Sequence, residues 1–171
     1  AAVKEKQVQA RGAVSQAYQD NLAAIERTGA PTVALSNAQI LSAYGPDKGG
    51  QMLAQLGRAR ALYTAVQSTA LTSPEEDAAT LERLNPSGEG YAAQAHEQDM
   101  LLQALNQKQA AVKKDPANYV LSVSPQIAGM FSDAAKDPTK LPAAAAALDA
   151  AYDRLGVPDY QRNLLPRDQA N

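Results

Sequence analysis

The sequence predicts an all-α protein, an antiparallel bundle of long helices followed by a compact set of short helices. Three observations predict this class. Apolar residues recur at alternating steps of three and four over several stretches, the spacing of one helix face. Helix start and stop signals built from Pro, Gly, Ser and Asp recur along the chain. No stretch alternates convincingly with the two-residue period of a strand, and alanine supplies 36 of the 171 residues.

The first expected helix covers residues 2–27 and ends at Thr28-Gly29-Ala30-Pro31, where Gly is a C-terminal cap. Its apolar stripe is rich in alanine, so the helix can bury little and is only marginally stable alone. We therefore expect it to project from the body or to pack on a neighbouring protomer. The residues expected to make this assembly contact are Val14, Tyr18, Leu22 and Ile25.

A short helix and a long helix are expected next. Ser36 is a suitable N-cap for the short helix, and Gly45-Pro46 closes it. The long helix covers about residues 46–71 and has the apolar spacing of a helix packed against another helix. The packing residues expected on it are Met52, Leu56, Tyr63 and Val66.

Ser73-Pro74 begins the next helix, because Glu76 completes a capping box and proline suits the first turn. This helix stops near Asn85-Pro86, and a second long helix follows over about residues 90–114. The simplest packing folds the two long helices antiparallel and buries the stripes of both. The packing residues expected on the second are Tyr91, Leu102, Leu105 and Val112.

The helices shorten after Asp115. Four X-Pro pairs fall within 28 residues, each a bend or a cap followed by a residue that fixes the first helical φ. They are Asp115-Pro116, Ser124-Pro125, Asp137-Pro138 and Leu141-Pro142, and a helix over residues 143–155 closes at Gly156. We expect one α-helical domain, residues 1–171, with subdomains at 1–114 and 115–171. From its first and last residues we expect the chain to be a fragment of a longer polypeptide.

Composition excludes several classes of function. The chain has no Cys and a single His, which excludes thiol catalysis, thiolate metal sites and any two-His metal site within it. The formal net charge of −2 disfavours a dedicated nucleic-acid binder. No apolar run approaches the roughly 20 residues of a transmembrane helix. We expect no cofactor and no metal.

Three local patterns resemble functional motifs, and each is better explained by structure. His96 has Met100 four residues on, where a helical zinc-protease motif has a second His. Residues 45–50 are rich in glycine but lack the spacing of a phosphate-binding loop. Glu89 lies between two glycines, with no sign of the apolar pocket that a glycosidase acid needs. We expect no catalytic residue in this segment.

Four segments share a pattern of caps, turns and small residues. They are residues 43–46 before a long helix, 73–79 leading to 84–91, 115–121, and 154–158 leading to 164–166. In this combination and order they resemble an α-helical region of large phage and prophage virion proteins, over about four-fifths of the chain. The resemblance implies proteins that are packaged inside the particle and ejected with the genome, and that often carry a lytic transglycosylase domain elsewhere.

The leading hypothesis is a non-catalytic structural or ejection segment of a phage virion protein. It would lie inside the virion, reach the host envelope on delivery, and contact other virion chains or further copies of itself. No Glu-Ser pair of a transglycosylase occurs in the chain, so no catalytic residue is carried over from the resemblance. Two alternatives stay open. One is an accessory glycan-binding lobe of a peptidoglycan lytic transglycosylase, which predicts exposed Tyr, Gln and Asn on one concave surface. The other is a periplasmic or cytoplasmic bacterial adaptor unrelated to phage.

Overall fold

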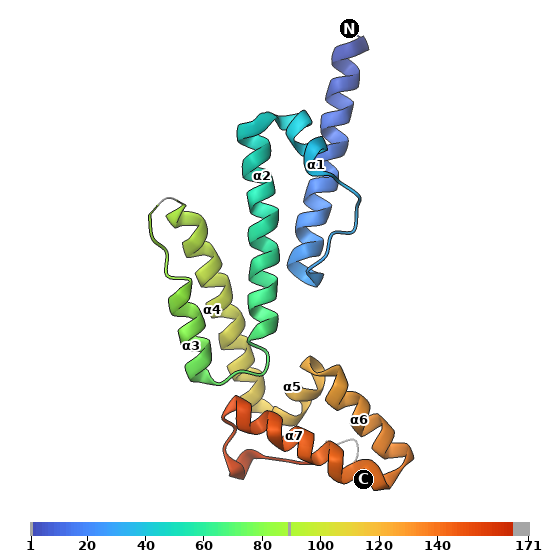
Figure 1. Cartoon of the computed structure of the whole chain (residues 1–171), viewed down its shortest axis with the longest axis vertical. Helices are drawn as coiled ribbons and strands as arrows, with labels where there is room; N and C mark the ends of the chain where they lie inside the picture. The colour runs from blue at the N-terminus through green and yellow to red at the C-terminus, as the bar shows by residue number, and fades with distance from the viewer. Residues whose placement is uncertain (1, 89, 166–171) are drawn as a thin grey trace. The chain divides into compact units, whose positions relative to one another are not determined.

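The structure is a computed structural model that describes residues 2–88 and 90–165. Over these residues it contains seven α-helices and two 3-10 helices (Figure 1). No strand occurs in the described part of the chain, which confirms the predicted all-α class.

The chain divides into two compact units, Ala1–Gln67 and Ser68–Asn171. The composition shift near Asp115 lies within the second unit, at the junction of two helices that contact each other. The boundary therefore differs from the expected one. A change in helix length does not mark a break in packing when the helices on both sides share a core.

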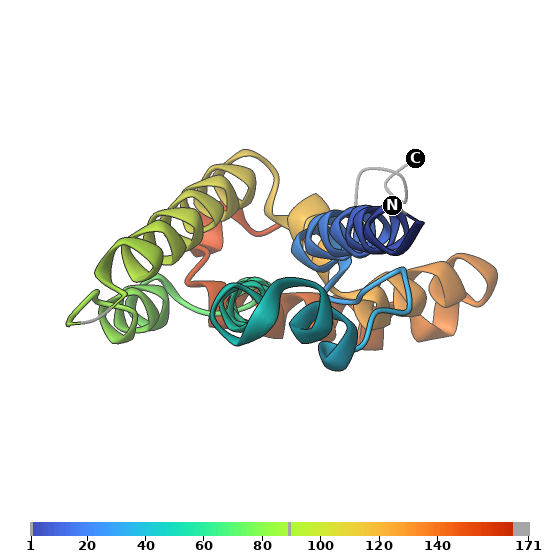
Figure 2. The same cartoon turned by 90° about the horizontal axis from the view of Figure 1, so that it is seen from above.

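The first unit consists of α1 (Ala2–Thr28) and α2 (Asn37–Ser68), and the longer part of α2 runs beside α1 in the same direction (Figure 1, Figure 2). The Tyr18 hydroxyl donates to Gln55 Oε1 at 2.7 Å, and further along both helices Gly29 lies against the ring of Tyr63. A Cβ at Gly29 would be 2.5 Å from that ring, so glycine is required by space as well as by its φ of 76°.

Parallel neighbours need a returning connection, and residues 29–36 with the start of α2 provide it. The Asn21 side chain holds this connection against α1, accepting from the backbone N–H groups of Thr32 and Val33 and donating to the Val33 carbonyl. The early part of α2 then ends at Gly45, whose φ of 78° breaks the helix before Pro46. The predicted stop at Gly45-Pro46 is confirmed.

The expectation for the apolar stripe of α1 is wrong. Tyr18 and Ile25 are only 4% and 1% exposed, and Val14 and Leu22 are half-buried. This part of α1 is covered within its own unit, because the returning connection and α2 pack on it. Tyr18 and Ile25 therefore belong to the core of the first unit, and Val14 and Leu22 are partly covered at its edge. In the first half of α1, by contrast, every side chain described before Val14 is exposed.

In the second unit, α3 (Pro74–Arg83) and α4 (Tyr91–Lys114) form an antiparallel helical hairpin (Figure 1). The predicted capping box is confirmed: Ser73 Oγ accepts from the Glu76 N–H, and the Glu76 carboxylate accepts from the Ser73 N–H. The stripe predicted on α4 is partly wrong, since Tyr91 is 60% and Leu102 43% exposed. Leu105 is buried as predicted, and Leu101 is buried in place of Leu102.

The expected stripe of α2 is half-buried at Met52, Leu56, Tyr63 and Val66, and on α4 Leu105 is buried and Val112 half-buried. The two long helices of the expected pair belong to different units. Their antiparallel pairing stays a prediction.

The short helices are α5 (Pro116–Val123), α6 (Pro125–Lys136) and α7 (Leu141–Leu155), with a 3-10 turn at Pro138–Lys140 before α7 and another at Asp159–Gln161 after it. Asp115, Ser124 and Asp137 each cap the following helix or turn with a side-chain oxygen, as their X-Pro pairs predict. Gly156 closes α7 in the left-handed conformation, with φ 68°. The main core lies among these three helices and the residue after Gly156. Its large members are Val120, Ile127, Phe131, Leu148, Tyr152, Leu155 and Val157.

Candidate functional site

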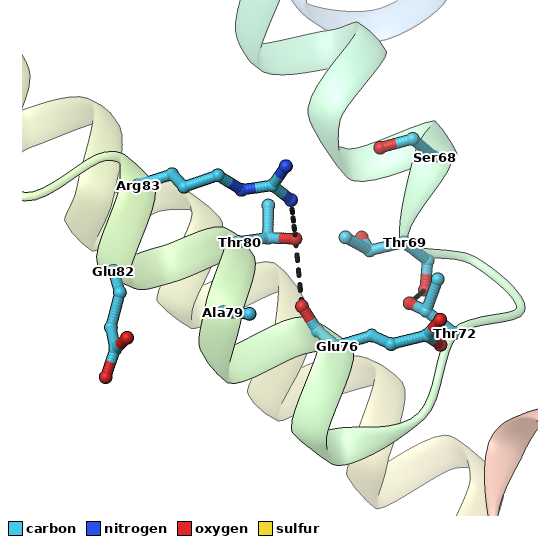
Figure 3. A pocket seen from close by; sticks show the side chains of 8 residues that line it. All are labelled: Ser68, Thr69, Thr72, Glu76, Ala79, Thr80, Glu82 and Arg83. Atoms are coloured by element: carbon cyan, nitrogen blue, oxygen red, sulfur yellow. Dashed lines mark hydrogen bonds between the residues drawn. The ribbon is translucent and has the colours of Figure 1, made fainter.

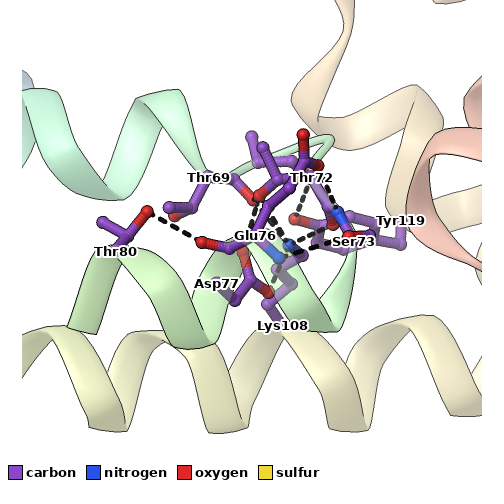
Figure 4. Close-up of polar contacts among 9 residues, drawn as sticks. Thr69, Thr72, Ser73, Glu76, Asp77, Thr80, Lys108 and Tyr119 are labelled. Carbon is purple, nitrogen blue, oxygen red and sulfur yellow. Dashed lines mark hydrogen bonds and ion pairs between the residues drawn. The ribbon is translucent and has the colours of Figure 1, made fainter. Parts of the chain in front are cut away.

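A buried lysine marks the most distinctive polar cluster of the described chain. Lys108 lies on α4 and reaches the connection before α3, where its ammonium meets three residues (Figure 4). We call Thr69, Thr72, Asp77 and Lys108 the Lys108 cluster. The side chains of Lys108 and Asp77 are 9% and 3% exposed, so this ion pair lies almost entirely out of water.

Oxygen atoms surround the Lys108 ammonium. Nζ donates to the Thr69 carbonyl at 2.6 Å, to the Thr72 carbonyl at 2.7 Å and to Asp77 Oδ2 at 2.7 Å. The Thr72 hydroxyl lies 3.2 Å from Nζ and itself donates to Asp77 Oδ1 at 2.6 Å. The three protons of the ammonium and both oxygens of the carboxylate therefore have partners within the cluster.

Tyr119 of α5 adds a further contact to the same connection. Its hydroxyl donates to the Ala70 carbonyl at 2.7 Å. Burial, together with the negative charge of Asp77, raises the pKa of Tyr119 to about 12. The connection between α2 and α3 is thus held by side chains from α3, α4 and α5.

The arrangement favours a structural role for Lys108 over a chemical one. A nucleophilic or Schiff-base lysine must lose a proton, and such lysines lie in apolar or cationic surroundings that favour the neutral amine. Here the surroundings of the Lys108 nitrogen are instead a carboxylate and two carbonyl oxygens. A satisfied buried pair of this kind fixes the position of the groups that it joins.

A surface depression of about 670 Å³ lies beside the cluster, lined mainly by hydroxyl-bearing and charged residues (Figure 3). Its polar side chains contact one another: Arg83 donates to the Thr80 hydroxyl at 2.9 Å, and that hydroxyl donates to the Glu76 carbonyl. The Glu76 carboxylate is engaged in the capping box. Glu82 points away from the other labelled side chains (Figure 3). The depression has no tyrosine, asparagine or glutamine in its lining.

A second, smaller hollow of about 240 Å³ adjoins the other side of the Lys108–Asp77 pair. The end of α7 and the residues after it, Gly156 to Pro158, form one wall, and Val112 and Lys113 of α4 belong to another. The charged groups of Lys108 and Asp77, which also line this hollow, are hydrogen-bonded to each other and to Thr72.

Arg162 fastens the segment after α7 to that helix. Its guanidinium contacts Asp149 at 3.0 Å, Asp153 at 2.7 Å and Asp159 at 3.4 Å, and its Nε donates to the Val157 carbonyl. The hydrogen bond with Asp153 is the main cause that raises the pKa of Arg162. The Tyr152 hydroxyl donates to the Asn163 carbonyl at 2.6 Å, and burial raises the pKa of Tyr152 to about 12.

The motifs weighed in the sequence do not meet at one site. His96 and Met100 lie exposed on α4, and residues 45–50 form the break in α2 and the turn after it. Glu89 lies outside the described residues. Within the described ranges, no group of three or more His, Cys, Asp or Glu side chains could hold a metal ion.

Sequence reasoning missed the Lys108 cluster, although a signal for it exists. Leu101, Leu105 and Val112 face inward on α4, and Lys108 occupies the place in that series between Leu105 and Val112. A lysine inside an apolar seam indicates a buried charge with a partner elsewhere in the chain. The partner, Asp77, stands one residue after the Glu76 of the capping box.

Comparison with known proteins gives no match among protein families, curated proteins or solved structures. In the part of the chain that the structure describes, no helix is both long and apolar enough to cross a membrane.

Proposed function

We propose that this chain is a non-catalytic helical segment of a phage virion protein, which supplies contact surfaces for assembly in the particle or in a conduit through the host envelope. The observation that carries the structural part is the set of large apolar side chains that the chain leaves uncovered. Val8, Tyr91 and Tyr160 are 69%, 60% and 85% exposed, and they lie on three separate elements. Covering these side chains with another chain would remove apolar surface from water, which is favourable.

The Lys108 cluster supports the same proposal. Its charges and hydroxyls satisfy one another, so it orders the start of the second unit and offers no reactive group. Because these buried polar groups are engaged in the fold, we expect the chain to act through its exposed side chains.

The assignment to phage rests on the resemblance of the four sequence segments. Three of them contain a Pro junction that ends one helix or starts the next: Gly45-Pro46, Ser73-Pro74 and Asp115-Pro116. If the chain is packaged with the genome, the partners for its exposed surfaces are other virion chains or further copies of itself.

Proteomics of purified particles tests this proposal. The strain that encodes the chain is induced, and particles are purified on a density gradient and digested for mass spectrometry. We expect peptides of this segment to follow the particle peak together with the capsid protein. Peptides confined to the cell fraction, in an induced culture that yields particles, would contradict the phage assignment and favour a bacterial adaptor.

An accessory glycan-binding lobe is the second candidate, because sugars stack on exposed aromatic rings and Tyr91 and Tyr160 are both exposed. The full chain would then co-sediment with purified peptidoglycan sacculi. Tyr91→Ser and Tyr160→Ser would each weaken that binding, whereas Tyr152→Phe would not, because Tyr152 is buried. A chain that stays in the supernatant at every protein concentration excludes this candidate.

A further inference from the structure

The first half of α1 is a helix segment whose described side chains are all exposed, and its hydrogen bond with α2 is made by backbone, where the Tyr44 hydroxyl donates to the Arg11 carbonyl at 3.3 Å. Glu5 and residues 8–13 are all exposed, and Val8 is the most exposed of the large apolar side chains described in the first unit. Arg11 follows Val8 by three residues, so both lie on the same face of the helix. This half continues the packed second half of α1 into solvent, so a partner for this face would bury apolar surface that the first unit leaves exposed.

This half of α1 carries a positive charge. Residues 2–13 contain Lys4, Lys6 and Arg11 against Glu5 alone, a net charge of +2. Pairing this segment with the same segment of a second copy would bring like charges together, which opposes a symmetric contact. The segment fits an acidic surface.

The helical hairpin of α3 and α4 is such a surface. Residues 74–114, the whole hairpin, contain seven Asp or Glu and four Lys or Arg, for a net charge of −3. Asp77 and Lys108 neutralise each other in the buried pair, and Lys113 and Lys114 stand at the C-terminal end of α4, far along the helix from Tyr91 and Asp99. Tyr91 and Leu102 are both exposed and stand eleven residues apart, about three helical turns, so they lie on one face of α4. Asp99, which is also exposed, lies three residues before Leu102. The hairpin therefore presents apolar side chains flanked by carboxylates.

We propose that the first half of α1 in one copy of the chain docks on the acidic α3–α4 hairpin of a second copy. Val8 would meet the apolar face that contains Tyr91 and Leu102, and Arg11 would face Asp99. The contact joins two different surfaces, so each copy keeps one donor and one acceptor surface free for the next, and copies associate head to tail. This inference rests on the proposed function, because it names a second copy as one partner of the assembling segment.

A charge-exchange experiment on the full chain tests the docking. Sedimentation velocity is measured over a range of protein concentrations for the unmodified chain, for Arg11→Glu, for Asp99→Arg, and for an equimolar mixture of the two variants. We expect the unmodified chain to self-associate and each variant to do so roughly tenfold more weakly. The mixture should recover association, because the carboxylate introduced at position 11 of one variant then faces the guanidinium introduced at position 99 of the other. Raising the salt from roughly 20 mM to roughly 500 mM should weaken association of the unmodified chain.

Lys136→Glu is the matched control, since it reverses one exposed charge on α6, an element that belongs to neither surface, and should leave association unchanged. Thermal melts of all variants show that each remains folded. The docking is contradicted by a chain that stays monomeric at every concentration, by association that salt leaves unchanged, or by a mixture that fails to recover. Binding of the unmodified chain to DNA or to anionic vesicles, without self-association, also contradicts it. Each of these results leaves the particle proteomics, and hence the proposed function, to be judged separately.

Discussion

At the scale of single residues, the structure depends on a few polar side chains that hold the chain connections in place. Lys108 binds the connection between α2 and α3, and Asn21 binds the connection between α1 and α2. Arg162 holds the segment after α7 against that helix. Each of them has at least one partner more than ten residues away in sequence. Helix caps set where the helices begin, and these residues set how the chain passes from one helix to the next.

Lys108→Met should destabilise the second unit strongly. The change leaves Asp77 buried without its cation, and breaking one partner of a buried ion pair costs about 3–5 kcal/mol. Urea unfolding followed by circular dichroism measures the loss. The double variant Lys108→Met/Asp77→Leu should recover part of it, because no unpaired charge remains. Lys113→Met, an exposed neighbour on α4, is the control. A loss no larger than that of this control would show that the cluster contributes little.

Tyr152 makes the stability of the chain depend on alkaline pH. Its pKa is raised from 10.0 to about 12 in the folded chain, so its contribution is complete below pH 10 and is lost as the pH rises through about 12. Tyr152→Phe should lower stability at about pH 8 by about 1 kcal/mol, through the lost hydrogen bond to Asn163. The variant should then lose less stability than the unmodified chain between about pH 10 and about pH 12, where the unfolded chain ionises this tyrosine and the folded chain does not. Tyr160→Phe is the exposed control, and equal alkaline losses in Tyr152→Phe and the unmodified chain would refute the assignment.

At the scale of the elements, the helices could be predicted from the sequence because their signals are local. Ser73, Pro74 and Glu76 form a capping box within one turn, and Gly45-Pro46 and Gly156 end helices by their own backbone preferences. Which face each helix buries is decided by segments far along the chain. From the sequence alone the stripe of α1 indicates an assembly surface, because nothing local places α2 and the returning connection on it. On α4 the burial of Leu101 in place of Leu102 has the same origin.

Replacement of the α1 stripe tests the corrected role of this element. Tyr18→Ser and Ile25→Ser each remove a large buried side chain from the core of the first unit, so each should destabilise the chain by about 3 kcal/mol. Tyr18→Phe should cost less, because it loses only the hydrogen bond to Gln55. Thermal unfolding and sedimentation velocity are measured together. If the Ser variants change sedimentation and leave the thermal midpoint of unfolding unchanged, the stripe is an assembly surface after all.

At the scale of the whole chain, charge is distributed unevenly between the two units. Residues 1–67 contain seven Lys or Arg and four Asp or Glu, and residues 68–171 contain nine and fourteen, so the net charges are +3 and −5. The total of −2 conceals this difference. The opposite signs of the two units are consistent with the docking proposed above, in which a basic segment of the first unit meets an acidic surface of the second.

The Lys108 cluster could be predicted only in part, because the place of Lys108 in the apolar series of α4 indicates a buried charge but does not identify its partner. Asp77 stands in an acidic first turn, where it is typical of a favourable partner of the helix dipole, and Lys108 stands on a long helix with many polar residues. Only the packing of α3 against α4 brings them to 2.7 Å. The capping box that begins α3 is predictable from its own residues, whereas the buried pair that it positions requires the fold.

The proposal that the chain is a delivered virion segment is tested most directly by comparing full particles with emptied ones. Particles are purified, half are triggered to eject their genome, and peptides of this segment are quantified against the capsid protein in both samples. We expect the segment to be present in full particles and strongly depleted in emptied ones. Its absence from full particles would contradict a virion protein, and equal amounts in both samples would contradict delivery with the genome.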